Sequence, residues 1–506
     1  MEGRELPVGW VEAQLEDLIG IDGLLSDGDW VESKDQDPDG NIRLLQLADI
    51  GDSIFLDKSQ RFVNSEQYAR LRCTEVLEGD ILIARMPDPL GRSCMVPSLG
   101  QRLITVVDVA IVRPGKDSVF AEWLMYAINS PLIRERIELQ STGTTRRRIT
   151  RKKLAALEFP VPPRNEQRRI AAKLDTTLAA VDACRRRLDG VAAMLKRFRQ
   201  AVLAEATSGE LTREWREERG IEDAWEAQAL GNLLSDIRYG TAQKCTYEVC
   251  GKPVFMIPNI LEGTIRHEDL KYAEFDQQEI NKLSIRAGDL LVIRSNGSLD
   301  LVGRTALAVE ADEGFLFAGY LIRLRPKQDV VNPGFLLFVL LSPVKRRRIE
   351  LAARSTSGVN NINSKFLSCL QLKLPSLEEQ HEICRRVQDL FTLADQLEAK
   401  LNTARKVIDR LTPALLAKAF RGELVPQDPN DEPASVLLER IRAARQADAA
   451  AGKPSRRGRR KAAANPEQDP RPAAPAPADL LAQLLQECGA LSERALLAAS
   501  ELDPAG

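Results

Sequence analysis

The sequence predicts an α+β protein in which two domains of mixed α/β character are separated by a pair of long antiparallel helices. Three observations predict this fold. The chain has 506 residues, enough for several domains of about 100–200 residues each. The motif around Gln167 returns around Gln380, and the motif at Gly209 returns at Gly422, both 213 residues later. Apolar residues between these anchors recur in steps of mostly 3 and 4, the pattern of a coiled-coil seam. We therefore expect an internal pseudo-twofold repeat.

Each predicted long helix begins just after a proline and is followed by a glycine, and the first should run from about residue 164 to 206. Pro413 lies inside the second and should kink or open it. A helix with one apolar stripe cannot bury it alone. We favour pairing between the two copies, while packing of each helix on its own domain, or pairing between chains, remains open. The predicted seam consists of Ile170, Leu174, Leu178, Leu188, Leu195, Val202, Ile383, Val387, Leu397, Leu401, Ile408 and Leu415.

The segments before the two helices also match, with shifts that vary because insertions collect in loops. The stretch 79–85 parallels 288–294, and each reads as a turn into a buried strand. Segments 120–129 and 335–341 suit short helices, and 295–297 reads as a turn. The predicted organisation is a first mixed domain (1–160), a central helical spacer (161–212), a second mixed domain (213–374), a distal helical spacer with a short helix (375–450), a Pro/Ala/basic linker (451–478) and a small helical segment (479–506).

Composition limits the classes of function. The formal net charge is −2, so any nucleic-acid binding has to come from local basic patches. No apolar run reaches the roughly 18–20 residues that a membrane span needs, and the N-terminus lacks the apolar core of a signal peptide. We expect a cytoplasmic protein with no membrane partner. The eight cysteines include no C-x-x-C pair and should be free thiols, and we expect no metal site. Two histidines nearly exclude a His-based catalytic triad or a His-rich metal centre.

Two basic clusters occupy the same place in each repeat. Residues 130–155 carry a net charge of +6 and residues 342–366 one of +5. Duplicated basic clusters in a near-neutral protein favour a DNA backbone held at two related sites, although a solvated helix face that meets acidic partners is the alternative. Arginines and an asparagine at strand ends and turns could also reach base edges, although Asn296 in particular suits a simple turn. The candidate DNA-binding residues are Arg85, Arg92, Arg146, Arg147, Arg148, Arg151, Arg294, Asn296, Arg304, Arg346, Arg347 and Arg354.

Motifs of common catalytic chemistry are missing from the sequence. There is no phosphate-binding G-x-x-x-x-G-K-[ST] loop and no G-x-G-x-x-G. The stretch 332–335 resembles the Asn-Pro-Pro-Tyr type of adenine methyltransferase motif only superficially, because the second proline and the tyrosine are absent. We expect a binding and scaffolding protein that is not catalytic by itself and binds no cofactor.

This layout resembles the specificity subunit of type I restriction–modification systems over about residues 6–447. The shared motifs are Glu166, Gln167 and Ile170, their copies Glu379, Gln380 and Ile383, and the stretches 209–211, 419–424 and 431–438. The resemblance implies that two target-recognition domains each read one half of a bipartite, asymmetric site in double-stranded DNA, with the helices setting the gap between the halves.

The resemblance also implies partners. Two modification subunits, which are methyltransferases that use S-adenosylmethionine, would dock on the helices and carry out DNA methylation. Restriction subunits with motor and nuclease activity would join them and use ATP and Mg²⁺. The alternative from another class is a non-enzymatic coiled-coil assembly or scaffold protein that binds acidic partners. A standalone nuclease–methyltransferase is a third interpretation, which the missing motifs argue against.

Overall fold

The structure is a computed structural model that describes residues 6–87, 89–143, 147–221, 225–353 and 360–450. The chain forms two compact units. The first consists of Met1–Arg187 with Ala404–Gly506, and the second of Leu188–Thr403. Each unit therefore combines a mixed α/β domain with parts of both long helices. The predicted linker 451–478 and the segment 479–506 lie outside the described residues.

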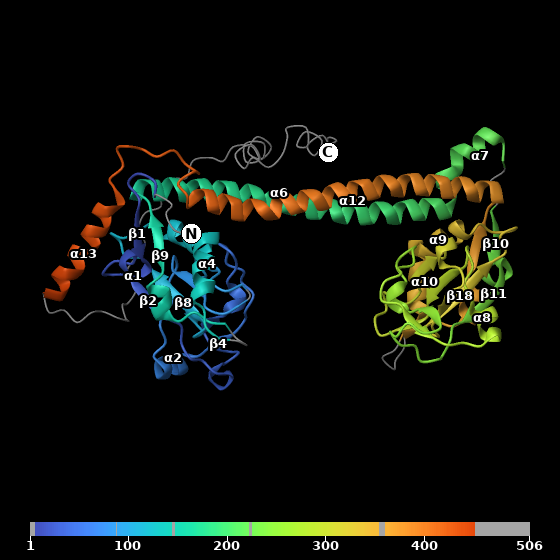
Figure 1. Cartoon of the computed structure of the whole chain (residues 1–506), viewed down its shortest axis with the longest axis horizontal. Coiled ribbons are helices and arrows are strands. Elements are labelled where there is room, and N and C mark those ends of the chain that lie inside the picture. The colour runs from blue at the N-terminus through green and yellow to red at the C-terminus, as the bar shows by residue number, and fades with distance from the viewer. Residues whose placement is uncertain (1–5, 88, 144–146, 222–224, 354–359, 451–506) are drawn as a thin grey trace. The chain divides into compact units, whose positions relative to one another are not determined.

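The two long helices are α6 (Arg164–Ser208) and α12 (Leu377–Ala419), and Figure 1 shows them running alongside one another. The predicted pair of long helices is thus present, and the first ends two residues later than the sequence indicates. Gly209 follows α6 with a φ of +93°, a left-handed conformation that favours glycine and ends the helix. The helix α12 continues through Pro413, whose side chain is exposed.

The first domain contains three sheets. A four-stranded antiparallel sheet has the order β2-β8-β5-β6, a three-stranded sheet has the order β4-β3-β7 with β3 and β7 parallel, and β1 pairs with β9. The strands are β1 (Val11–Gln14), β2 (Leu24–Asp27), β3 (Ile42–Leu45), β4 (Phe62–Val63), β5 (Ile81–Ala84), β6 (Ser93–Met95), β7 (Arg102–Thr105), β8 (Val109–Arg113) and β9 (Glu158–Val161).

Among the described residues, nine strands of the second domain repeat this topology strand for strand. Its four-stranded sheet has the order β11-β18-β14-β16, its three-stranded sheet has the order β13-β12-β17 with β12 and β17 parallel, and β10 pairs with β20. The strands are β10 (Glu226–Ala229), β11 (Leu234–Tyr239), β12 (Lys252–Phe255), β13 (Lys271–Ala273), β14 (Leu290–Ile293), β16 (Thr305–Leu307), β17 (Leu316–Phe317), β18 (Leu321–Pro326) and β20 (Gln371–Leu374). The internal repeat therefore extends to the order and direction of the strands.

One strand pair departs from the turn that the sequence suggests. Ser295–Asn296 forms the short strand β15, which pairs antiparallel with β19 (Asn360–Asn361). The expected turn comes directly after it, because the backbone N–H of Ser298 donates to Oδ1 of Asn296 at 2.8 Å. The partner strand lies more than sixty residues away, so local sequence carries no signal for this pairing.

Short helices connect the sheets to the long helices. The predicted helix 120–129 corresponds to α3 (Ala121–Asn129), and 335–341 to α9 (Pro333–Leu341). The basic clusters begin on α4 (Pro131–Gln140) and α10 (Pro343–Ala353) and continue to α5 (Arg151–Ala155) and α11 (Ser364–Ser368). Within the described ranges the other α-helices are α1 (Leu15–Leu18), α2 (Ser65–Leu71), α7 (Arg213–Arg219), α8 (Gln277–Leu283) and α13 (Ala434–Ala450).

The strand β14 shows why its sequence is apolar throughout. Leu291 and Ile293 pack into a core that also holds Phe255 of β12, while Leu290 and Val292 pack with α9 and with residues of the long helices. A strand buried on both faces reads as a continuous apolar run rather than an alternating one. None of the helices in the described ranges is both long and apolar enough to cross a membrane.

Candidate nucleic-acid interface

A buried glutamine at the start of each long helix fixes that helix to its domain. Oε1 of Gln380 accepts a hydrogen bond from the backbone N–H of Asn332 at 2.7 Å, and Oε1 of Gln167 accepts one from the N–H of Phe120 at 2.8 Å. Asn332 and Phe120 are the N-cap residues of α9 and α3. The repeated Glu-Gln motif therefore ties each long helix to a core helix of the domain that precedes it.

Glu379, the glutamate of the second copy, lies in a buried polar cluster. Its Oε1 accepts hydrogen bonds from the guanidinium of Arg216 and, at 2.7 Å, from Oγ1 of Thr212. Its Oε2 accepts one from Nε1 of Trp225 at 3.2 Å. Arg216 and Glu379 form an ion pair whose side chains are 5% and 3% exposed.

Glu166, the glutamate of the first copy, has fewer partners. Its Oε2 accepts a hydrogen bond from Nε1 of Trp10 at 3.0 Å, and its buried Oε1 has no hydrogen-bond partner among the described residues. Burial raises the pKa of Glu166 above its usual value.

The basic helix α10 uses one of its arginines to hold a loop of its own domain. Arg346 donates through Nη1 to the carbonyl of Val302 and through Nη2 to that of Asp300, each at 2.9 Å. It also forms an ion pair with Glu350 at 3.1 Å. The sequence predicts that Arg346 contacts DNA, but these bonds give it a structural role, which Arg134 repeats in α4 by donating to the carbonyl of Leu90 at 2.8 Å.

Arg85 is likewise engaged inside the first domain. It follows β5, is 4% exposed and forms an ion pair with Asp27. Its Nε donates to the carbonyl of Ile149 at 3.0 Å, and its Nη1 donates to that of Val107 at 3.2 Å. Burial lowers the pKa of this guanidinium from its usual value. These contacts leave little of the Arg85 side chain exposed, so its position gives no support to the prediction that Arg85 reads bases.

Other candidates in the basic clusters face solvent. Arg147, Arg151 and Arg347 are exposed, and the neighbouring Lys152 and Arg348 are exposed too. Arg151 begins α5 and Arg347 lies on α10. Exposed cations of this kind can approach a phosphate backbone without breaking internal bonds.

Arg148 is half-buried beside Arg85. It donates through Nη2 to the carbonyl of Val107 at 2.9 Å and lies 3.6 Å from Asp108. The backbone N–H of Ile149 donates to the Arg85 carbonyl at 3.2 Å. In the first domain, the structure thus brings together the end of β5 and the basic segment that precedes α5.

The same junction occurs in the second domain, with different side chains. The backbone N–H of Ile362 donates to the carbonyl of Arg294 at 2.8 Å, as Ile149 does to Arg85. The guanidinium of Arg294 lies over the ring of Tyr239, 4.5 Å from its centroid, and its Nε donates to Oδ1 of Asn361 at 3.3 Å. Arg294 is half-buried rather than enclosed.

Two further candidates lie beside the repeated glycines that precede β6 and β16. Arg92 is half-buried and donates through Nη2 to the carbonyl of Leu47 at 2.8 Å. Arg304 is half-buried after Gly303, near Asp300, whose pKa is lowered by the Ser298 hydroxyl and by the nearby arginines. The two remaining candidates, Arg146 and Arg354, lie outside the described residues.

Most of the predicted seam residues are buried. Ile170, Leu174, Val202, Ile383, Val387, Leu401, Ile408 and Leu415 are buried, and Leu178, Leu188, Leu195 and Leu397 are half-buried. Val202, Ile383 and Val387 belong to the core of the second domain. The stripe therefore serves both the helix pair and the anchoring of the helix to a domain.

Ion pairs join α6 to α12 in each unit, in the register of two antiparallel helices. In the first unit, Arg185 approaches Asp409 at 3.4 Å. In the second, Arg199 approaches Asp395 at 2.7 Å and Glu398 at 2.9 Å. Partly exposed pairs such as these contribute little to stability but help to define which residues face one another.

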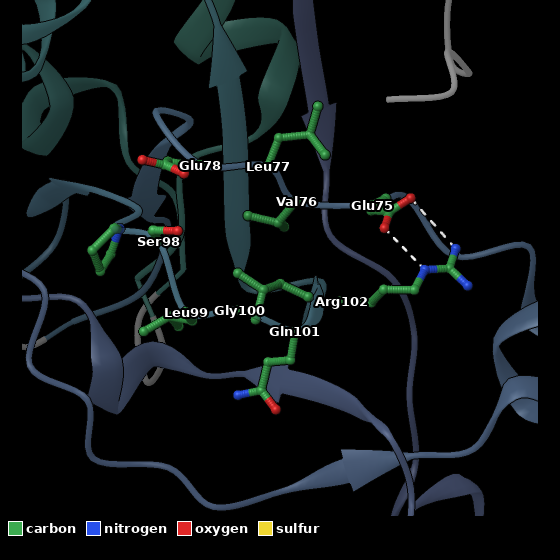
Figure 2. Close-up of a pocket in the computed structure, with 11 residues that line it drawn as sticks. Glu75, Val76, Leu77, Glu78, Ser98, Leu99, Gly100, Gln101 and Arg102 are labelled. Atoms are coloured by element: carbon green, nitrogen blue, oxygen red, sulfur yellow. Dashed lines mark hydrogen bonds and ion pairs between the residues drawn. The ribbon is translucent and has the colours of Figure 1, made fainter. Parts of the chain in front are cut away.

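Figure 2 shows residues that line a hollow in the first domain. Its volume is about 350 Å³, and its lining does not suit a nucleic acid. Its lining includes the carboxylates of Glu75 and Glu78, and Arg102 is paired with Glu75 at 2.9 Å. In the part of the chain that the structure describes, no group of three or more metal-ligating side chains occurs, and the seven described cysteines are free.

Sequence reasoning missed three residues of the second junction. Tyr239, Asn360 and Asn361 lie beside Arg294 and Asn296, although each is at least fifty residues away in sequence. Asn360 donates through Nδ2 to the carbonyl of Gly297 at 3.0 Å. The one local signal was the polar stretch Asn360–Asn361 within an otherwise basic segment.

Comparisons with known proteins agree with the duplicated architecture. The family described as "Type I restriction modification DNA specificity domain" matches residues 7–191 and 223–404, one stretch for each repeat. The type I restriction enzyme EcoKI specificity subunit of Escherichia coli (strain K12) is 34% identical over 346 residues, which covers 67% of this chain and 74% of that relative.

Two solved structures are similar in fold. The first is a chain from a study of complex assembly and conformational transition of the type I R-M system. It has a TM-score of 0.61 and 21% identity, and the match covers 83% of this chain and 100% of that one. The second is the HsdS subunit from Thermoanaerobacter tengcongensis, with a TM-score of 0.52 and 21% identity, covering 84% of this chain and 99% of that one.

Proposed function

This chain belongs to the type I restriction modification DNA specificity family and is the DNA specificity subunit of a type I restriction–modification system, and on that premise we propose that each of its two mixed domains reads one half of a bipartite, asymmetric DNA site. The subunit is non-catalytic itself. The observation that carries the proposal is the strand-for-strand repeat of the two domains, each followed by a long helix. Two similar domains with different surface side chains suit two half-sites of different sequence.

The helix pair sets the number of unread base pairs between the two half-sites. Both helices are uninterrupted over more than forty residues. A buried apolar stripe and ion pairs between the two antiparallel helices support a fixed register between them. Because an α-helix rises 1.5 Å per residue, the length of the pair translates directly into a length along the duplex.

Exposed cations of the basic clusters hold the phosphate backbone. Arg147 and Arg151 serve the first half-site and Arg347 the second, with Arg92 and Arg304 at the adjacent turns. Arg148, which directly follows Arg147, and Asn296, which lies in β15 just after β14, are further candidates for DNA contact. Phosphate contacts position a protein on DNA and make binding depend steeply on salt, whereas base contacts provide the sequence preference. The half-buried polar side chains at the β14 junction, and Arg148 at the β5 junction, are the source of that preference.

The subunit acts as part of a type I complex. Its finer composition belongs to this proposal: two modification subunits dock on the helix pair and methylate DNA with S-adenosylmethionine, and restriction subunits join them and use ATP and Mg²⁺. Support comes from family membership and from the similar chain whose structure concerns assembly of a type I R-M system. The duplicated chain offers each of two identical partners an equivalent docking surface.

Removing one heptad from each helix tests the spacing function. The deletion of residues 193–199 together with 395–401 removes segments that face one another through the Arg199–Asp395 pair and preserves the seam phase. Seven residues correspond to roughly 10 Å, or about three base pairs. We expect methylome sequencing to show the same two half-sites with a gap shorter by about three base pairs.

A matched control replaces exposed residues of the same segments without changing their length, and its gap should equal that of the wild type. An unchanged gap in the deletion variant, with methylation retained, would refute the spacing function. Methylation of sites whose half-site sequences have changed would refute the assignment of reading to the domains.

A further inference from the structure

The same position of the repeat carries an arginine in both domains, but only one of the two is available to a ligand. Arg85 and Arg294 each directly follow one of the two central strands of a four-stranded sheet. Each backbone carbonyl accepts a hydrogen bond from the segment that follows the basic helix of its domain. Arg85 is 4% exposed and forms an ion pair with Asp27. Arg294 is half-buried. Unlike Arg85, it forms no ion pair with an acidic side chain among the described residues.

The side chain of Arg294 is held in place from two sides. Its guanidinium lies 4.5 Å from the centroid of the Tyr239 ring, and Nε donates to Oδ1 of Asn361 at 3.3 Å. The Tyr239 hydroxyl in turn accepts a hydrogen bond from the backbone N–H of Ser364 at 2.8 Å, which fixes the ring. Stacking on an aromatic face and an engaged Nε restrict the rotamers of an arginine before any ligand arrives.

The two terminal nitrogens of Arg294 have no hydrogen-bond or ion-pair partner among the described residues. A guanidinium presents its donors as a planar fork, which matches two acceptors on one edge of a ligand. The surrounding side chains are polar and neutral: Asn296 and Asn360 are half-buried, Asn361 is exposed, and Tyr320 is 57% exposed. Neutral amides around a restrained guanidinium suit an uncharged, planar ligand edge better than they suit a phosphate group.

We propose that Arg294 reads a guanine in the half-site of the second domain, donating through its two terminal nitrogens to O6 and N7 in the major groove, and that the first domain has no such contact at the equivalent position. Guanine is the base whose major-groove edge carries two adjacent acceptors, and the arginine fork is the common partner of that edge. Tyr239 acts as a positioning residue. This inference rests on the proposed reading of one half-site by each domain.

Reconstitution of the full methyltransferase complex allows a direct test. The wild-type site is first obtained from the methylome, and duplexes are then made with each base at every position of both half-sites. We expect R294A to reduce the discrimination for guanine at one position of the second half-site by roughly tenfold or more, with the other positions unchanged. Y239L should reduce it less, because the fork remains but is no longer held.

Two further variants keep the test decisive. R294K retains the charge without the planar fork, so it should also weaken the guanine preference. It replaces R294A in the test if R294A does not fold. R347A changes an exposed arginine on α10 of the same domain, and it should weaken binding to all sequences alike and lower the slope of log affinity against log salt by about one.

The results separate this inference from the proposed function. If R294A behaves as R347A should, with uniform weakening and a smaller salt slope, Arg294 contacts a phosphate and the inference is overturned. If R294A and R294K both retain the wild-type base preference, the inference is overturned while the reading of half-sites stands. If the wild-type complex shows no sequence preference in the second half-site, the proposed function itself fails.

Discussion

The two copies of the Glu-Gln motif show how one repeated sequence acquires two different environments. Gln167 and Gln380 make matching hydrogen bonds at the starts of α6 and α12. Glu379 receives three hydrogen-bond donors, one of them from the buried Arg216, whereas Glu166 receives Nε1 of Trp10 and keeps a buried Oε1 without a partner in the described residues. The tryptophan contact is repeated, but the guanidinium hydrogen bond is not, because Arg169 acts on Glu166 through its charge alone among the described residues.

The difference arises from the segments that succeed the two long helices. After α6 the chain turns at Gly209 into α7, which brings Thr212 and Arg216 against Glu379. After α12 the chain instead leads to α13, which packs on α1 of the first domain. The two long helices are thus followed by different contacts: a buried ion pair with Glu379 in the second unit, and a contact of α13 with α1, with partly exposed ion pairs at Asp17, in the first.

The largest effect is expected for Glu379→Gln. The glutamine keeps the shape of the side chain but leaves the Arg216 guanidinium buried without an opposite charge. Removal of one partner from a buried ion pair typically costs about 3–5 kcal/mol of unfolding free energy. We expect the second unit to lose stability by about 3 kcal/mol or more, measured as faster hydrogen exchange in peptides from residues 225–353, with peptides from residues 6–143 unaffected.

The double variant Glu379→Gln with Arg216→Met is the matched control. It removes both charges, so most of the lost protection should return, because replacement of a buried ion pair by apolar residues is often close to neutral. Wild-type exchange rates in Glu379→Gln alone would show that the ion pair contributes nothing to the second unit.

The loss of a buried side chain of α13 in the first unit should be next in size. Leu438 of α13 is 4% exposed, and α13 also reaches α1 through an ion pair between Arg445 and Asp17 at 3.4 Å. Leu438→Ala removes buried apolar volume, which costs about 2–4 kcal/mol in a packed core. Hydrogen exchange should accelerate in the first unit, and Leu393→Ala, at a position 50% exposed on α12, should leave both units unchanged. Equal effects in the two units would contradict the difference between their contacts described above.

Much of this architecture can be predicted from the sequence because its main elements are continuous. A long helix tolerates no insertion without losing phase, so the constant shift between Gln167 and Gln380 and between Gly209 and Gly422 identifies both helices. The central strands are equally readable, since β5 and β14 are apolar throughout and follow a Gly-Asp turn. The short helices α3 and α9 are recognisable from their apolar composition.

The candidate site could be predicted only in part, because burial of an arginine depends on residues far away in sequence. Arg85 and Arg294 have the same local sequence setting, yet Asp27, from a different strand, encloses one of them, while Tyr239 supports the other. Arg346 resembles the exposed Arg347 in sequence but lies on the side of α10 that faces the carbonyls of Asp300 and Val302. Charge clusters indicate a surface, and tertiary contacts decide which charges remain available.

Glu166→Gln is expected to have the smallest effect and the opposite sign from Glu379→Gln. The pKa of Glu166 is raised by burial, so its charged form is less favourable in the folded state than in the unfolded one. Between the unfolded value of 4.5 and the raised folded value, the folded chain binds more protons, so the stability of the first unit falls as pH rises through that window. The glutamine has no charge to desolvate and can still accept from Trp10, so at pH 7.5 it should stabilise the first unit by between zero and about 1 kcal/mol. The gain should shrink as pH is lowered towards 4.5, because the wild-type carboxyl then becomes neutral as well. Hydrogen exchange of the two proteins from pH 5 to 8 measures this difference. A loss of stability in Glu166→Gln at pH 7.5 would mean that the attraction of Arg169 outweighs the cost of burying the carboxylate, which would make the two copies of the motif more alike.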